Sequence, residues 1–448
     1  MSSNQVRVIQ TAKDTTDRLT EKQPLIFEGK GGREMQMVNV YDDVVYQEID
    51  GFGGALTESS AVTIEKMSPE KQAEIMDAYF NAETGLGYTY CRTHINSCDF
   101  SLGNYAYVEE EDPTLANFDI SRDKQALIPL IKRAAGLMGE GFQLFASPWS
   151  PPAWMKTNGM MNEGGQLKPE YREAWANYYV KYLQAYLAEG IKIWGITVQN
   201  EPMAKQRWDS CLYTAEEEKD FVRDHLGPAL EAAGLGHIKI MIWDHNKELV
   251  YDRAKAAFED AEASKYIWGV GFHWYSGDHF ESLDIVHRLY PDKRLIFTEG
   301  CVELGTHLGA WHTGERYGHD IIGNLNNWMN GWTDWNIVLD EQGGPNHVGN
   351  FCDAPIIADT KTDKVHYESS YYYIGHFTKY IRPGAVRIGC TKYTDKIETT
   401  AFRNTDGTIA LVVMNRTEDA VPFAVRYREQ MADTSIPGHS IQTLLFNR

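Results

Sequence analysis

Residues 175–200, WANYYVKYLQAYLAEGIKIWGITVQN, contain a helical pattern followed at once by a strand pattern. In the first half, large side chains recur every three or four residues and form one apolar stripe: Trp175, Tyr178, Tyr179, Tyr182, Leu183, Tyr186 and Leu187. Gly190 can adopt the left-handed conformation that ends helices. The run Ile193–Asn200 then shows little alternation, as in a strand buried on both faces. The stretch predicts one helix–strand unit of a parallel sheet.

The same alternation recurs from about residue 50 to residue 340. The apolar runs are Asp50–Ala55, Thr89–Asn96, Gln143–Ser150, Ile193–Asn200, Ile238–Asn246, Ile267–Tyr275, Arg294–Gly300 and Gly331–Leu339. Eight strand candidates that alternate with helices predict an α/β fold, a (β/α)8 TIM barrel. An open doubly wound sheet is the alternative, but no Gly-rich dinucleotide fingerprint follows any of the runs.

Two further helices have recognisable boundaries. Thr214 and Glu217 have the spacing of a capping box, and the helix that they start is expected to end near Gly234. Another helix is expected to begin around Ser121 and to be kinked by Pro129.

The two ends of the chain have a different pattern. Ile397–Arg403 and Thr408–Asn415 are strand-like and are joined through Asp406-Gly407, which is typical of a hairpin. Four more segments have strand character: Val421–Tyr427, Ile441–Phe446, Leu25–Phe27 and Glu34–Val40. We therefore expect an attached β-sandwich built from both chain termini. The expected divisions are residues 1–48 for N-terminal sandwich strands, 49–382 for the barrel and 383–448 for the C-terminal sandwich.

Composition excludes several classes of protein. The 448 residues include 43% hydrophobic and 24% charged residues, which are ordinary globular values. The net charge of −20 argues against nucleic acid and anionic membranes as partners, and no run is long and apolar enough to span a bilayer. The start, MSSNQVR, lacks an apolar signal core, so we expect a cytoplasmic protein. The six cysteines have no close CxxC spacing and predict free thiols rather than a zinc site or disulfide scaffold.

Two glutamates stand where a barrel places its chemistry, at the C-terminal ends of strands. Glu201 follows the fourth run and Glu299 ends the seventh. A pair of carboxylates about 5 Å apart suits retaining glycoside hydrolysis, whereas about 6.5–9.5 Å suits inversion. We expect burial and the negative Glu299 to raise the pKa of Glu201. Solvated rim carboxylates are the alternative.

Aromatic side chains at the same strand ends suit the apolar faces of sugar rings. They are Trp149, Trp154, Trp274, Tyr275, Trp332 and Trp335, and Asp99, Asn200 and Asn350 are possible polar partners. His94, His245 and His273 lie on separate runs without metal-ligand spacing, so we expect satisfied barrel histidines and no metal.

Seven ordered motifs carry a resemblance to a known family. They are DGFGGA (50–55), SCDFS (97–101), ASPWS (146–150), NEP (200–202), HWY (273–275), EGC (299–301) and GWTDWN (331–336). The chain resembles family 30 glycoside hydrolases, most closely their glucosylceramidase (acid β-glucosidase) branch, from about residue 49 to the C-terminus.

The resemblance implies retaining chemistry on a β-glycoside without a cofactor, with the oligomeric state left open. It implies that Glu201 is the acid/base and Glu299 the nucleophile. It also implies roles in sugar binding for Asp99, Trp149, Asn200, Tyr275, Trp335 and Asn350, and supporting roles for Arg92 and His273. The expected activity is β-glucosidase or glucosylceramidase-like; β-xylosidase, β-fucosidase, β-1,6-glucanase and a catalytically silent glycan-binding protein remain alternatives.

Overall fold

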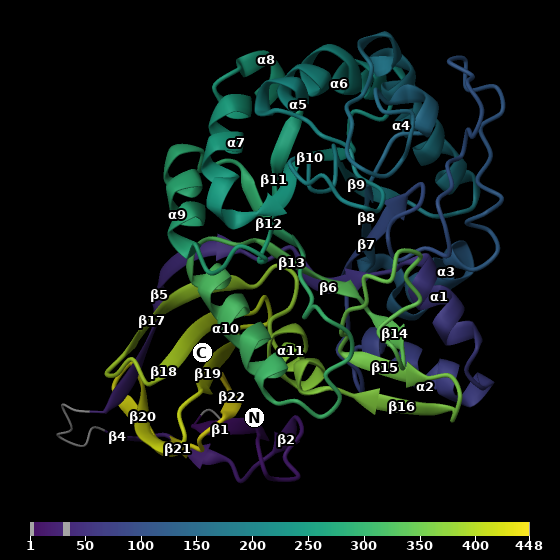
Figure 1. Cartoon of the computed structure of the whole chain (residues 1–448). Coiled ribbons are helices and arrows are strands. Elements are labelled where there is room, and N and C mark those ends of the chain that lie inside the picture. Colours follow the sequence, from purple (N-terminus) through teal and green to yellow (C-terminus); the bar gives the residue numbers. More distant parts are fainter. Residues whose placement is uncertain (1–3, 30–35, 448) are drawn as a thin grey trace.

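A computed structural model describes residues 4–29 and 36–447 (Figure 1). Within these ranges, eight parallel strands close into a barrel, which confirms the predicted fold class. The strands are β6 (Gly51–Ala55), β7 (Tyr90–Ile95), β8 (Gln143–Pro148), β9 (Ile193–Thr197), β10 (Lys239–Asn246), β11 (Ile267–His273), β12 (Arg294–Glu299) and β13 (Gly331–Asn336). Each lies inside, or begins within a residue of, one of the eight apolar runs.

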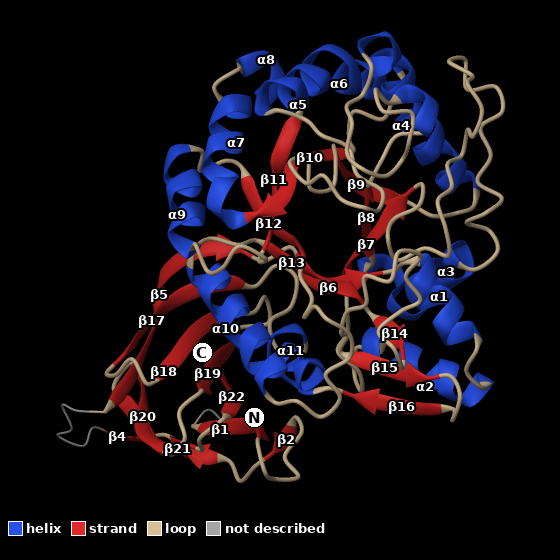
Figure 2. Cartoon of the chain, in the orientation of Figure 1, coloured by secondary structure: helices blue, strands red, loops and turns tan. Residues whose placement is uncertain are grey.

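Helices surround the barrel on its outer side (Figure 2). They are α1 (Glu58–Glu65), α2 (Pro69–Phe80), α3 (Leu127–Met138), α4 (Arg172–Ala188), α5 (Ala215–Phe221), α6 (Gly227–Ala232), α7 (Val250–Phe258), α8 (Ala261–Ser264), α9 (Phe280–Leu289), α10 (His312–Asn326) and α11 (Ser369–Thr378). No helix in the described part of the chain has the length and apolar character needed to span a membrane.

The predicted helix boundaries hold in two cases. Gly190 follows α4 with a φ of 82°, and Thr214 and Glu217 form the expected reciprocal cap at the start of α5. That helix passes through a π-helical turn, Val222–Leu226, into α6 before Gly234. The start around Ser121 is wrong: residues 121–126 form turns, and α3 begins at Leu127. Pro129 therefore lies in the first turn, where its missing N–H costs no helical hydrogen bond.

A large sheet joins both chain ends. In the described residues its order is β2-β1-β22-β19-β18-β17-β5-β20-β21-β4, with β3 beside β1. The strands are β1 (Gln5–Ala12), β2 (Thr20–Glu21), β3 (Leu25–Ile26), β4 (Glu28–Gly29), β5 (Met37–Glu48), β17 (Val386–Lys392), β18 (Ile397–Arg403), β19 (Thr408–Asn415), β20 (Val421–Tyr427), β21 (Gln430–Ile436) and β22 (Ser440–Asn447). β1 pairs with β22, and β5 lies between β17 and β20, so both termini build the sandwich.

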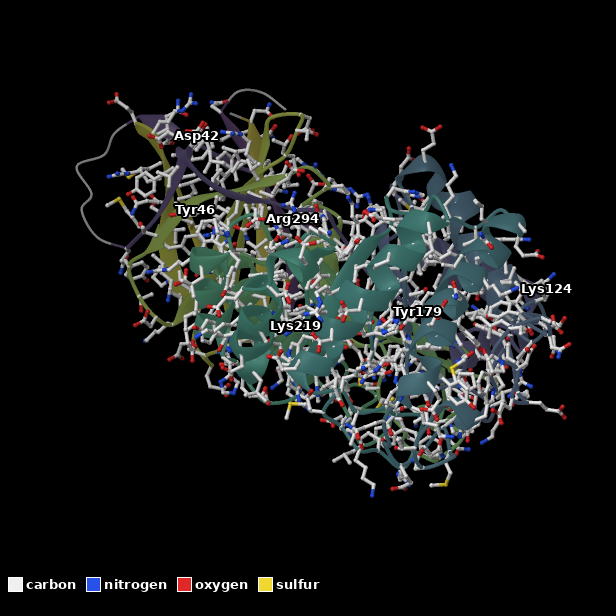
Figure 3. All side chains as sticks on the ribbon, turned by 90° about the horizontal axis from the view of Figure 1, so that it is seen from above. Asp42, Tyr46, Lys124, Tyr179, Lys219 and Arg294 are labelled. Carbon is white, nitrogen blue, oxygen red and sulfur yellow. The ribbon has the colours of Figure 1, made fainter. Side chains whose placement is uncertain are left out.

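The sandwich has its own core, in which Val6 and Val8 of β1 pack with Leu444 and Phe446 of β22. The predicted divisions at 48/49 and 382/383 fall in the connections from β5 to β6 and from α11 to β17. Residues 34 and 35 of the predicted strand Glu34–Val40 lie outside the described residues. Figure 3 shows Asp42 and Tyr46 of the sandwich at one end of the molecule and Lys124 and Tyr179 toward the barrel end.

A smaller sheet packs against α1, where Ser60 Oγ donates to the Val338 carbonyl oxygen. It consists of β14 (Val338–Asp340), β15 (Ile356–Asp359) and β16 (Lys364–Tyr367), in that order. The loop from β14 to β15, residues 341–355, returns over the C-terminal end of the barrel.

The barrel interior is layered. Tyr90, Phe145, Met241 and Ile296 pack together in its lower part. Side chains two residues further along a strand face the same side, so Arg92 of β7 projects into the layer above Tyr90. Gly53 permits the close approach of β6 to β7, since a Cβ there would lie 1.9 Å from the Tyr90 carbonyl oxygen. Arg92 therefore lies between the apolar cluster of the lower barrel and the mouth of the barrel.

Candidate active site

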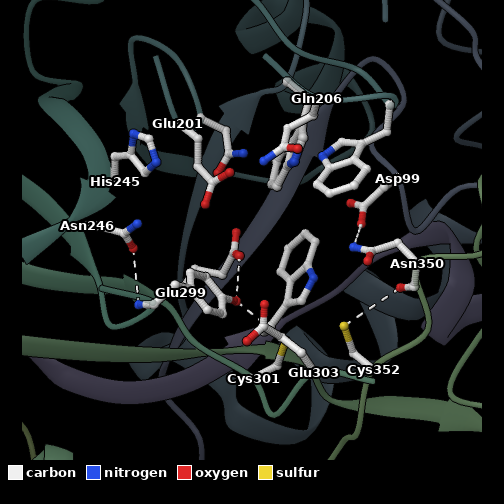
Figure 4. A pocket seen from close by; sticks show the side chains of 15 residues that line it. Asp99, Glu201, Gln206, His245, Asn246, Glu299, Cys301, Glu303, Asn350 and Cys352 are labelled. Atoms are coloured by element: carbon white, nitrogen blue, oxygen red, sulfur yellow. Dashed lines mark hydrogen bonds between the residues drawn. The ribbon is translucent and has the colours of Figure 1, made fainter. Parts of the chain in front are cut away.

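A cavity of about 180 Å³ opens at the C-terminal end of the barrel (Figure 4). The structure brings eight of the ten predicted site residues to its wall: Asp99, Trp149, Asn200, Glu201, Tyr275, Glu299, Trp335 and Asn350. The other two, Arg92 and His273, are fully buried and hydrogen-bond residues of that wall. The volume suits a ligand about the size of one sugar ring.

The two glutamates converge. Glu201 follows β9 and Glu299 ends β12, and one carboxylate oxygen of each lies within 4.8 Å of the other and of a His273 nitrogen. Figure 4 shows the two carboxyl groups pointing toward each other across the cavity. This separation is in the range of about 5 Å associated with retaining glycosidases.

Arg92 organises the floor of the cavity. Its Nη1 donates to Glu299 Oε2 at 2.6 Å, and its Nη2 donates to Asp244 Oδ2 at 2.7 Å and to Asn200 Oδ1 at 2.9 Å. The guanidinium also lies 4.7 Å from the ring centroid of Trp149. Since all of these groups are buried, each charge is compensated by its neighbours in the protein and not by water.

Asp244 connects the arginine to the histidine. Its Oδ1 lies 2.9 Å from His273 Nε2, and Thr197 Oγ1 donates to its Oδ2 at 2.7 Å. Burial acts to raise the pKa of Asp244, but the Arg92 charge and the hydrogen bond from His273 outweigh it and hold this pKa well below the usual value. A permanently ionised Asp244 therefore sits beneath the two glutamates.

The protonation of Glu201 differs from expectation. Burial raises the pKa of Glu201, but the hydrogen bond from His273 and the charges of His245 and His273 outweigh it, so the pKa is lowered. For His273, burial lowers the pKa, while Glu299, Asp244 and Glu201 together raise it to about 9. The prediction of a raised Glu201 pKa is wrong, because the hydrogen bond from His273 and the charges of His273 and His245 outweigh burial.

Glu299 has the opposite balance. Burial raises its pKa above the usual value, against the charges of His273 and Arg92, which lower it. Tyr275 Oη donates to Glu299 Oε1 at 2.9 Å, and so adds a second donor that stabilises the carboxylate.

A polar and aromatic wall faces the glutamates. Asn350 Nδ2 and Asn346 Nδ2 donate to Asp99 Oδ2 at 3.2 and 3.1 Å. Burial raises the pKa of Asp99 to about 7 despite these bonds. Trp149 and Trp335 stack with ring centroids 5.1 Å apart and an interplanar angle of 19°. This wall combines an apolar aromatic surface with a carboxyl and an amide, which suits the faces and hydroxyls of a sugar.

Strained backbone aims several of these side chains. Asn96, Glu201, Trp243 and Asp244 have φ values of 61°, 48°, 71° and 50°, in the left-handed region that non-glycine residues seldom adopt. Asn96 and Glu201 follow β7 and β9, and Trp243 and Asp244 lie in the C-terminal half of β10. At Trp243–Asp244 the pairing of β10 with β11 also shifts register, which turns Asp244 toward Arg92 and His273.

The site does not fit a metal ion. Among the described residues, the one group with metal-ligand spacing is Glu201, His273 and Glu299. Both His273 nitrogens already face carboxylates, at Asp244 and Glu201, and the ring is cationic up to about pH 9. With the Arg92 guanidinium on Glu299 as well, a cation would meet two positive charges and no free imidazole lone pair.

Sequence reasoning missed part of the wall. Gln206, Trp208, His245, Asn246, Cys301, Glu303 and Cys352 also line the cavity, and Asp244 lies beneath it. The sequence predicts that His245 is a satisfied histidine, but its Nδ1 is buried without a hydrogen-bond partner in the described structure. The placement of Asp244, His245 and Asn246 at the end of a predicted strand was the one signal that could have found them.

Three of the expected rim aromatics lie elsewhere. Trp332 is a fully buried core residue that stacks on Phe297, and Trp274 packs on Tyr317. Trp154 donates to the Val108 carbonyl oxygen and packs on Tyr171. Their strand parity or loop path turns these three away from the cavity, which leaves Trp149, Tyr275 and Trp335 of the predicted set.

Known proteins share both parts of this chain. Residues 49–381 match the Glycosyl hydrolase family 30 TIM-barrel domain, and residues 384–444 match the Glycosyl hydrolase family 30 beta sandwich domain. The lysosomal acid glucosylceramidase of Mus musculus is 38% identical over 425 residues, which cover 90% of this chain and 82% of the mouse protein. The endo-1,6-beta-D-glucanase of Neurospora crassa is 29% identical, covering 83% of this chain and 79% of that protein.

Solved structures agree with this assignment. SrfJ from Salmonella typhimurium superposes with a TM-score of 0.96 at 40% identity, covering 99% of this chain and all of that one. An endo-beta1,6-glucanase superposes with a TM-score of 0.89 at 32% identity, covering 99% of both chains. The resemblance seen in the motifs is therefore confirmed, and this chain belongs to glycosyl hydrolase family 30 and is a glycoside hydrolase.

Proposed function

We propose that this glycoside hydrolase is a retaining, exo-acting β-glucosidase that releases terminal glucose through a covalent glycosyl-enzyme. The observation that carries the proposal is the approach of the Glu201 and Glu299 carboxylates to within 4.8 Å. At that separation one carboxylate reaches the anomeric carbon while the other reaches the leaving oxygen, and no room remains for a water between carboxylate and sugar, as inversion needs.

Glu299 is the nucleophile in this proposal. Arg92 and Tyr275 donate to different oxygens of its carboxylate and stabilise the ionised form. The carboxylate attacks the anomeric carbon as the bond to the leaving oxygen breaks. Water later attacks the same carbon, releases Glu299 and restores the original configuration.

Glu201 is the acid and then the base, and His273 supplies its proton. His273 Nδ1 lies 3.3 Å from Glu201 Oε1. A proton that passes along this contact leaves a neutral imidazole, whose remaining N–H still donates to Asp244. Protonated Glu201 then gives the proton to the leaving oxygen and later takes one from the attacking water. The proton that Glu201 needs for the acid role is therefore held one hydrogen bond away, on His273.

The opposite wall recognises the sugar. Asp99 and Asn350 offer hydrogen-bonding groups to its outer hydroxyls, and the Trp149–Trp335 pair offers an apolar surface. Arg92 occupies the Asn200 oxygen, which orients the Asn200 NH₂ group as a donor for the 2-hydroxyl. The mouse relative supports glucose as the sugar and a glucosylceramide as one candidate substrate.

A β-1,6-glucanase is the second candidate. The cavity wall also carries the polar side chains of Gln206, His245, Asn246 and Glu303, which would bind a second sugar better than a lipid chain. The fungal relative and one of the superposed structures carry the name endo-1,6-glucanase. This reading changes the leaving group and keeps the same two glutamates.

Azide rescue tests the mechanism. Glu201→Ala should still be glycosylated by aryl β-glucosides with good leaving groups, and azide should restore turnover and give a β-glycosyl azide. An α-glycosyl azide would reverse the two roles. A panel of nitrophenyl β-glycosides, glucosylceramide and β-1,6-glucan oligomers, assayed with the unmutated enzyme, separates the two substrate candidates; hydrolysis of none of them would overturn the proposal.

A further inference from the structure

Three loops at the mouth of the barrel meet at one carboxylate outside the cavity, that of Asp209. Asp209 lies on the loop after β9, and its side chain is fully buried. From the loop after β7, Ser97 Oγ and Asn104 Nδ2 donate to its Oδ1 at 2.5 and 2.9 Å. From the loop after β14, His347 Nε2 lies 3.0 Å from its Oδ2.

His347 is held at both ring nitrogens. Besides the Asp209 contact, its ring hydrogen-bonds the backbone of Cys98, and its backbone N–H donates to the Asp99 carbonyl oxygen at 3.1 Å. The Asp209 carboxylate and the Cys98 backbone both favour the protonated ring and act to raise the pKa of His347. With side-chain exposures of 8% and 0%, His347 and Asp209 form a nearly buried ion pair.

The pair lies directly beside the proposed sugar-binding groups. Asn346 and Asn350, on either side of His347 in sequence, both donate to Asp99 Oδ2. Asp99 itself follows Cys98, whose backbone His347 contacts. The ion pair therefore joins the segment that carries the two asparagines to the segment that carries the carboxylate they bind.

We propose that the Asp209–His347 ion pair is a clamp that positions Asp99 and Asn350 for the sugar by fastening residues 346–350 to the loops after β7 and β9. The assignment of these residues to sugar binding rests on the proposed function. The clamp itself rests on the contacts of Asp209 and His347, neither of which lines the cavity. Both are positioning residues.

The clamp should depend on pH. The charged groups that face His347 are Asp209 and Asp99, and Lys156 faces Asp209 from the loop after β8. Burial lowers the pKa of His347, but the hydrogen bond to Asp209 and the two negative charges outweigh it and raise the pKa above 6.5. As pH rises through that raised pKa, the ring loses one donor. KM should then rise on the alkaline side.

Paired substitutions test the clamp through binding. His347→Gln and Asp209→Asn should each raise KM about tenfold and leave kcat within about twofold, since each removes a hydrogen bond between charged groups that holds the binding segment. The double variant should be no worse than the worse single variant, because both remove one interaction. His237→Gln, at an exposed histidine just before β10, is the matched control and should leave KM unchanged. A fall in kcat as large as the rise in KM, or additive effects of the two substitutions on KM, would overturn the clamp.

The pH profile adds a specific readout. Asp99, whose pKa burial raises to about 7, adds its own pH dependence to KM. The part of the alkaline KM rise that disappears in His347→Gln is the part due to His347. No change in the profile would contradict the proposal.

Hydrogen–deuterium exchange tests the clamp without turnover. Amides of residues 341–350 should exchange faster in His347→Gln and Asp209→Asn than in the unmutated protein and His237→Gln, while the barrel strands keep their protection. Unchanged exchange in these amides would overturn the clamp even in an active enzyme. Faster exchange in an enzyme that cleaves no glycoside would support the clamp and overturn the proposed function.

Discussion

Glu299 and Glu201 face one cavity from opposite sides but are held in different ways. Glu299 lies within strand β12 and accepts hydrogen bonds from Arg92 at 2.6 Å and Tyr275 at 2.9 Å. Glu201 lies beyond the end of β9 with a left-handed φ of 48°, and His273 contacts it at 3.3 Å. The proposed nucleophile is held by two short donors, whereas the proposed acid/base faces a partner that can exchange a proton with it. Glu299 is thus distinguished by its fixed position, and Glu201 by a neighbour that can supply a proton.

The largest expected effect comes from changing Glu299. Glu299→Gln should lower kcat/KM on all β-glycosides by on the order of 10⁴-fold or more, since no covalent intermediate can form. Glu303→Gln changes another carboxylate of the same cavity and should stay within about tenfold. Steady-state kinetics with a nitrophenyl β-glucoside measures both. Comparable losses in the two variants would remove the distinction between a nucleophile and a wall carboxylate.

The next largest effect is expected from changing His273, which contacts Glu201. His273→Asn should lower kcat by about 10²-fold for substrates with poor leaving groups and much less for those with good ones, since it impairs proton donation by Glu201. Rates for aryl glucosides of graded leaving-group pKa measure the difference. A loss that is equal across the series would show that His273 holds the nucleophile instead. Near-UV circular dichroism would check that the buried Asp244 left behind has not disturbed the fold.

Tyr275→Phe should have a smaller effect. It removes one of the two donors to Glu299 and should slow glycosylation about tenfold to a hundredfold, since a hydrogen bond to a charged group contributes about 1.5–3 kcal/mol. Pre-steady-state kinetics would follow the first step directly. An unchanged rate would mean that Arg92 alone holds the nucleophile.

The smallest expected effect is on stability. The pKa of His273 is raised from 6.5 to about 9 in the folded protein, so between these values the folded state binds more protons than the unfolded state. This stabilisation is complete below about pH 6.5 and is lost as pH rises through 9. Urea unfolding at pH 7 and pH 9 should show a lower unfolding free energy at pH 9, and the drop should be smaller in His273→Asn. Asp99 has a pKa raised to about 7, so it lowers the unfolding free energy mainly as pH rises from about 4 to 7.

The sequence predicted the barrel and the two carboxylates because both depend on patterns along the chain. Runs such as Ile193–Asn200 mark buried parallel strands, and strand ends mark the catalytic face. Glu201 and Glu299 follow from those two facts. The helix expected from Ser121 failed because residues 121–126 form turns around Asp123, whose carboxylate binds three tyrosines from distant segments.

Other features depend on contacts between segments and carry no local pattern. A register shift and left-handed backbone turn Asp244 inward, and neither can be foreseen from residues 239–246. The pKa direction of Glu201 depends on His273, which lies 72 residues away. Trp332 and Trp335 have the same residue type and neighbouring positions, yet strand parity sends one to the core and the other to the cavity.

The pairing of β1 with β22 has a consequence for biosynthesis. Residues 5–12 leave the ribosome before the barrel, and their partner, residues 440–447, is made after it. The early strand must therefore wait, unpaired at one edge, while the whole barrel is translated. The barrel is free to fold as it emerges, whereas the sandwich closes only after translation reaches the last strand. Removal of a few residues from β22 should therefore destabilise the whole sandwich, because β1 would lose its partner.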